Sequence, residues 1–193
     1  MCHALLGSST FWSFLSRIDH DLAAEARIAG CLFCGGALHS ARYPRKPRGV
    51  ERSVLGEAYE TRLSFCCDRD GCRRRMTPPS VRFLGRRVFL GAVVVLATAL
   101  AQGLSARRVA ALCAQFSVST RTLRRWRVWW TETFVASATW SGIRARLATP
   151  ITLALLPASL LERCAGADEN TRVTQLLRLI APLSGSRWVR EAM

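Results

Sequence analysis

The chain has 193 residues, of which 28 are basic and 13 acidic, so its formal net charge at pH 7 is +15. Half of the residues are hydrophobic, which excludes wholesale disorder and allows one ordinary domain or a few very small ones. Every basic residue except Lys46 is an arginine, and guanidinium groups suit phosphates and guanine edges, so we expect a polyanionic partner, double-stranded DNA.

Residues 1–30 are predicted to form an N-terminal amphipathic helix. Apolar residues recur at three- and four-residue steps over 11–29, and Gly30 ends the pattern. The segment lacks the basic region, apolar stretch and cleavage site of a secretory signal. We therefore expect a cytoplasmic, nucleoid-associated protein, in which thiols stay reduced and clustered cysteines bind metal.

Residues 31–80 are predicted to form a zinc ribbon. Short strands are expected at 37–43 and 59–66. The segment has too few apolar residues to fold without additional stabilisation, such as a bound metal ion. The knuckle "CLFCGG" lets one tight turn present two thiolates to a tetrahedral ion, and a second pair about thirty residues later would complete the site. The expected ligands of a structural Zn²⁺ are Cys31, Cys34, Cys67 and Cys72.

The choice between two neighbouring cysteines for the third ligand depends on loop length. Cys67 leaves four residues before Cys72, within the usual spacing, whereas Cys66 leaves five and points to the other face of the strand. Cys66 is the reserve, because a bulge in the strand would reverse the assignment. Other possibilities are His39 in place of a thiolate, unligated thiols, or a redox pair, which the glycines after Cys34 disfavour.

Basic residues surround this predicted ribbon. The loop 44–57 contains prolines and glycines and is expected to be an exposed arm. The run after Cys72 is expected to extend from the hairpin into solvent, where it could contact phosphates. The candidates for DNA contacts in these two places are Arg45, Lys46, Arg48, Arg73, Arg74 and Arg75. A merely solvated charged loop is the alternative interpretation.

Residues 88–101 form an unbroken apolar stretch. A helix that spans a membrane needs about twenty such residues, so this stretch of about fourteen predicts a buried core helix and no membrane association.

Residues 81–135 are predicted to form a helix-turn-helix DNA-binding domain. In "GLSARRVAALCAQFSVSTRTLRRWRVWW", Ser105 and Ser119 can each cap a helix, and "FSV" is the turn between them. Leu123, Trp126 and Trp130 fall on one side of the second helix and are expected to be buried. The other side carries the candidates for base and phosphate contacts: Thr120, Arg121, Arg124 and Arg125. An ordinary helical hairpin with a basic surface is the alternative, although residues 105–130 contain six arginines and no acid.

Residues 136–193 are predicted to form a C-terminal helical segment, which could dock a partner protein or form a homodimer. The expected fold is therefore mostly α-helical with a small β zinc ribbon, followed by a helix-turn-helix and C-terminal helices.

The order of these motifs resembles the zinc-ribbon and helix-turn-helix regions of bacterial insertion-sequence transposases. More closely, "YPRKPRG", "SFCCDRDGCRRRMTPPSVRFLGRRVFLG" and "RTLRRWRVWW" are similar to a family of small bacterial proteins associated with integrase-like mobile elements. The resemblance covers residues 31–130. It implies metal binding at the four cysteines named above and DNA reading by residues 119–130.

An integrase-type catalytic core needs three carboxylates on a sheet to bind two metal ions. After residue 131 the chain has few acids, all in helical patterns: Glu132, Glu162, Asp168, Glu169 and Glu191. We therefore expect no catalytic site. The hypothesis is a DNA-binding protein of a mobile genetic element that works with a separately encoded transposase or integrase. The alternatives are a transcriptional regulator and a transposase or nuclease with an unrecognised site.

Overall fold

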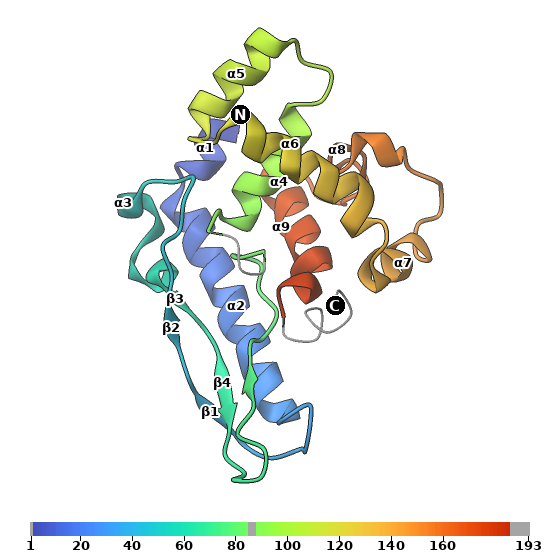
Figure 1. The fold of residues 1–193 in the computed structure, drawn as a ribbon. Helices are drawn as coiled ribbons and strands as arrows, with labels where there is room; N and C mark the ends of the chain where they lie inside the picture. The colour runs from blue at the N-terminus through green and yellow to red at the C-terminus, as the bar shows by residue number, and fades with distance from the viewer. Residues whose placement is uncertain (1, 85–87, 186–193) are drawn as a thin grey trace.

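The computed structural model describes residues 2–84 and 88–185. One long helix, α2 (Ser9–Ala29), runs along the molecule and follows a short helix, α1 (Cys2–Leu6) (Figure 1). The Ser8 side chain caps α2 by accepting a hydrogen bond from the Phe11 amide at 3.3 Å, and Gly30 ends the helix at a φ of 75°. At 1.5 Å per residue, the 21 residues of α2 span about 31 Å.

A small antiparallel sheet packs at the C-terminal end of α2 (Figure 1). Its strands are β1 (Leu38–Ser40), β4 (Phe65–Cys67) and β5 (Arg75–Met76), in the order β1-β4-β5. A second pair, β2 (Tyr43–Pro44) and β3 (Thr61–Arg62), extends the pairing of β1 with β4 toward the helices. The predicted strand segments therefore form paired strands that are shorter than expected, and they meet Ala23 of α2 in a small hydrophobic cluster.

The loop between β2 and β3 is partly helical. It contains α3 (Arg52–Leu55) and a 3₁₀ turn, η1 (Glu57–Glu60). Leu55 and Tyr59 are buried, and the Tyr59 hydroxyl donates a hydrogen bond to the Trp12 carbonyl of α2 at 3.0 Å. This part of the predicted arm is thus anchored to the long helix.

Helix α4 (Gly91–Leu100) lies at the centre of the helical part, and its first eight residues are buried. It contacts α5 (Ala106–Gln115), α6 (Thr120–Val128), α8 (Ala158–Leu161) and α9 (Glu169–Ile180). This burial on all sides is why the helix is apolar throughout.

The remaining elements complete the helical part. A π-helical segment, η2 (Trp129–Phe134), continues α6, and α7 (Ala138–Arg144) follows. Two 3₁₀ turns, η3 (Leu153–Leu155) and η4 (Ala181–Ser184), precede α8 and follow α9. One hydrophobic cluster contains Trp12, Tyr59, Val94, Trp130 and Leu176. All four predicted segments therefore contribute to one large core, and the sheet region has a small cluster of its own in addition.

A buried carboxylate ties three distant segments together. Asp19 of α2 is fully buried and accepts hydrogen bonds from the Ser80 hydroxyl (2.5 Å), the Val81 amide (2.7 Å) and Arg82 Nε (2.7 Å). Arg62 Nη1 lies 3.9 Å from the same carboxylate, and its Nη2 donates to the Pro78 carbonyl at 2.7 Å. The network fixes the end of the sheet region against the long helix.

The expectation of a mostly helical chain with a small antiparallel sheet and a cysteine cluster is confirmed. Within residues 2–84 and 88–185, no helix combines the length and the apolar character needed to cross a bilayer.

Candidate functional site

Four cysteine side chains converge where the turn after α2 meets the hairpin. The sulfur atoms of Cys31, Cys34, Cys67 and Cys72 all lie within 4.8 Å of one another. The sulfur atoms of Cys34 and Cys67 are 3.4 Å apart, and those of Cys31 and Cys72 are 3.7 Å apart. Four thiolates at such separations form a donor set that could hold one tetrahedral metal ion.

The turn after α2 presents the first two thiols. The Gly35 amide donates to the Cys31 carbonyl at 2.7 Å, and the Cys31 amide donates to the Gly36 carbonyl at 2.9 Å. Gly35 has a φ of 69°, a left-handed conformation that a glycine adopts without a Cβ penalty. The two hydrogen bonds close a tight turn with Cys31 and Cys34 on its inner side.

The hairpin presents the other two thiols. Cys67 ends β4 opposite Leu38, and its amide donates to the Arg74 carbonyl at 3.0 Å. The Cys72 amide donates to the Arg69 carbonyl at 2.9 Å, which forms the second turn. Each half of the candidate site is therefore shaped by its own backbone hydrogen bonds.

The regular alternation of β4 separates Cys66 from the cluster. Cys66 pairs with His39 on one side and with Arg75 on the other, and its sulfur lies 3.5 Å from the Arg73 carbonyl. Since β4 has no bulge between these paired positions, Cys67 and not Cys66 joins the four-cysteine group, and His39 lies outside it.

The surroundings act differently on the thiols of this cluster. A hydrogen bond from the Phe33 backbone is the main cause that lowers the pKa of Cys31 to about 7. Burial raises the pKa of Cys67 to about 12. A cation at the centre would favour the thiolate form of all four groups, because metal binding releases their protons.

The exposed Arg69 side chain contacts the turn that carries Cys34. Its Nη1 donates to the Cys34 carbonyl at 3.0 Å. Its side chain packs on Gly36, where an added Cβ would lie only 2.9 Å from the Arg69 Cγ atom. This arginine therefore holds the two cysteine turns together, a role that its place in a basic run did not indicate.

The three predicted hairpin arginines have different environments. Arg73 forms an ion pair with Asp70, and its Nε donates to that carboxylate at 3.1 Å. The Arg74 guanidinium lies over the Phe33 ring, 4.4 Å from the centroid. Arg75 is exposed on β5. The charges of Arg74 and Arg75 thus face solvent, whereas that of Arg73 is partly neutralised.

The loop candidates also differ. Lys46 and Arg48 are exposed, and the backbone of Arg48 bonds to the Val88 carbonyl (2.9 Å) and the Leu90 amide (3.3 Å). Arg45 is half-buried, with its guanidinium carbon 5.5 Å from the centroid of the Phe83 ring. Lys46 and Arg48 therefore present charge at the surface, while Arg45 also packs against the core.

Helix α6 is amphipathic as the sequence predicts. The Ser119 hydroxyl caps it by accepting a hydrogen bond from the Thr122 amide at 3.1 Å. Leu123, Trp126 and Trp130 are buried, and the Trp126 ring meets Phe89 edge-on at 5.1 Å. The exposed side carries all four predicted contact residues, Thr120, Arg121, Arg124 and Arg125.

A short turn sets the angle between α5 and α6. Phe116 and Val118 are buried, and the Val118 amide donates to the Cys113 carbonyl at 2.9 Å. Ser117 between them is exposed, with a φ of 52°. The alternation of apolar and polar residues in "FSV" is the sequence signal for this anchored turn.

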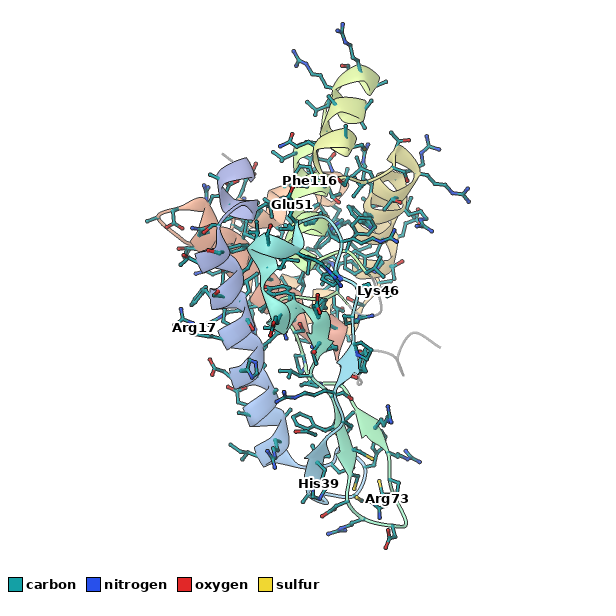
Figure 2. All side chains as sticks on the ribbon, turned by 90° about the vertical axis from the view of Figure 1, so that its left-hand side faces the viewer. Arg17, His39, Lys46, Glu51, Arg73 and Phe116 are labelled. Carbon is teal, nitrogen blue, oxygen red and sulfur yellow. The ribbon has the colours of Figure 1, made fainter. Side chains whose placement is uncertain are left out.

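Segments that carry predicted basic residues lie along one side of the molecule. In Figure 2, α6 at the upper right, Lys46 below it and Arg73 at the lower end follow the same edge, while α2 with Arg17 lies on the other side. The sequence contains no acid between Asp70 and Glu132 but has twelve arginines there, of which Arg82 is buried and paired with Asp19. The arrangement could attract a polyanion along this edge.

Comparisons of the chain with models of protein families, with curated proteins and with solved structures found no match. A proposal for its function must therefore be built on the cysteine cluster and the basic edge themselves.

Proposed function

We propose that the chain is a non-catalytic, double-stranded DNA-binding protein. Helices α5 and α6 with their turn act as a helix-turn-helix, in which α6 enters the major groove. The observation that carries the proposal is that α6 is amphipathic, with one buried apolar face and one exposed basic face. Its buried tryptophan and leucine fix its orientation, while Thr120, Arg121, Arg124 and Arg125 are exposed in the first half and middle of the helix.

The cysteine cluster has a structural role in this proposal. Four thiolates suit Zn²⁺, and a site with four protein ligands has no open position for a substrate. The metal would fix the β1-β4-β5 sheet as a zinc ribbon and would hold Arg74 and Arg75 at defined positions. The metal would therefore contribute to DNA binding through the fold and would not take part in chemistry.

The biological setting is proposed from the sequence resemblance. A protein of a mobile genetic element would bind the ends of that element and work with a separately encoded transposase or integrase. A transcriptional regulator built from the same modules would instead bind at promoters. Mapping the bound DNA in the native host distinguishes the two, because the first places the sites at element ends and the second at promoters.

The double substitution Arg121→Ala/Arg125→Ala is expected to weaken duplex binding at least tenfold, because it removes two contacts of about 1–3 kcal/mol each. Both side chains are exposed, so the melting temperature should stay near that of the wild type. The measurement is fluorescence anisotropy with a labelled duplex at several salt concentrations.

The matched control is Arg17→Ala/Arg27→Ala, which removes the same charge from exposed positions of α2. It should bind nearly as tightly as the wild type. Equal affinity of the α6 variant and the wild type at every salt concentration would reject α6 as the reading helix.

A further inference from the structure

The two groups of exposed arginines lie near opposite ends of α2. Leu6 and Gly7, just before α2, line the same groove as Phe116 and Ser117, just before α6. Near the other end of the helix, Ala23 packs in one small cluster with the hairpin strands. About 16 helical residues lie between these positions, and they span roughly 25 Å at 1.5 Å per residue.

The segments that carry the two groups also lie on the same side of the molecule in Figure 2. Figure 2 shows Phe116 in the upper part of the molecule and Arg73 at its lower end, with α6, Lys46 and the β4-β5 turn along one edge. The exposed arginines of α6 follow the turn at Phe116 within about ten residues, and the Arg74 guanidinium lies over Phe33, which packs against the cluster around Ala23. The separation of the two groups is therefore of the order of one turn of B-DNA, which is about 34 Å.

The link between the two groups is held by several contacts. The backbone of Arg48 is bonded to that of Val88 and Leu90, just before α4. Arg62 and Arg82 are joined through the buried carboxylate of Asp19. Because these contacts connect the hairpin, the long helix and the helical part, the spacing of the charges is set by the fold before any ligand binds.

From this spacing we infer that one chain contacts a duplex at three places along one face. Helix α6 lies in the major groove, Lys46 and Arg48 lie over the minor groove about half a turn away, and Arg74 and Arg75 contact phosphates about one full turn away. The ligand is thus a straight duplex of at least about 16 base pairs, roughly one and a half turns. The inference rests on the proposed function and adds the length and the shape of the DNA that the chain requires.

The experiment uses the full chain and a duplex selected by that chain from a randomised pool of about 30 base pairs, roughly three turns. The turn that lies beyond the α6 site is then removed in steps, and the affinity is measured by anisotropy. The wild type should lose at least tenfold in affinity when the distal turn is removed. The salt dependence should also become shallower by about 1.8, the value for two lost phosphate contacts.

The variant Arg74→Ala/Arg75→Ala tests the same contacts from the protein side. It should bind the long duplex as weakly as the wild type binds the short one, and the two proteins should bind the short duplex equally. The control Arg17→Ala/Arg27→Ala should retain the dependence on length.

The outcomes separate this inference from the proposed function. If the length series and the Arg74/Arg75 variant have no effect while the α6 variant loses affinity, the three-point contact is wrong and DNA reading by α6 stands. If the α6 variant also binds as the wild type does, both are wrong. Hydroxyl-radical protection at a single place on the selected duplex would likewise overturn the inference.

Discussion

Asp19→Asn is expected to lower the free energy of unfolding by about 3–5 kcal/mol, the range for breaking a buried ion pair. The substitution removes the negative charge that faces Arg82 and Arg62, and both arginine side chains are only 1% exposed. Burial already lowers the pKa of Arg62 to about 10, against the opposing effect of Asp19. For a chain of this size the melting temperature should fall by roughly 10 °C.

The control for this variant is Asp21→Asn, two residues along the same helix. Asp21 is exposed, so its loss should change the melting temperature by little. The measurement is thermal unfolding followed by circular dichroism. Equal melting temperatures for the two variants would show that the buried network does not hold the sheet region to the helices.

Cys67→Ser is expected to abolish metal binding and to unfold the hairpin. Structural zinc sites contribute about 10–16 kcal/mol of binding free energy in zinc-finger peptides, and the hairpin has only a small apolar cluster of its own. The metal content should fall from about one ion per chain to nearly none. The amides of residues 31–40 and 65–76 should then exchange rapidly, while those of α4 and α9 keep more protection because they belong to the larger core.

Cys66→Ser provides a matched control, because it makes the same change one position earlier on the same strand. Its sulfur lies outside the four-cysteine group, so the variant should keep both its metal and its amide protection. Metal analysis of the two purified variants, together with hydrogen exchange, makes the comparison. A metal-free wild type with a protected hairpin would contradict the structural role of the ion.

The sequence predicts the helix ends, the helix cap and the alternation of side chains along β4, because neighbouring residues determine each of these features. Residue spacing places α2 before Gly30, and the capping serine at 119 marks the start of α6. The alternation of side chains along a strand separates Cys67 from Cys66, and this is what the cluster shows. In each case the physical cause lies within a few residues of the effect.

The features that the sequence does not predict depend on contacts between distant segments. Asp19 lies four residues after Leu15 on the apolar side of α2, and that position is the one local sign that it is buried. Its partners Ser80 and Arg82 are about sixty residues away and cannot be deduced from spacing. The packing of Arg45 on Phe83 is not predictable from the sequence for the same reason, because an arginine in a basic loop is usually solvated.

The central claim is that α6 lies in the major groove of a duplex, and cross-linking tests it most directly. Thymines of a bound duplex are replaced by 5-bromouracil, whose bromine lies in the major groove where the thymine methyl group would be. After irradiation, mass spectrometry identifies the cross-linked residues. We predict cross-links within α6, among residues 120–128. Cross-links confined to α2 or α9, from a complex shown to be intact, would contradict the account.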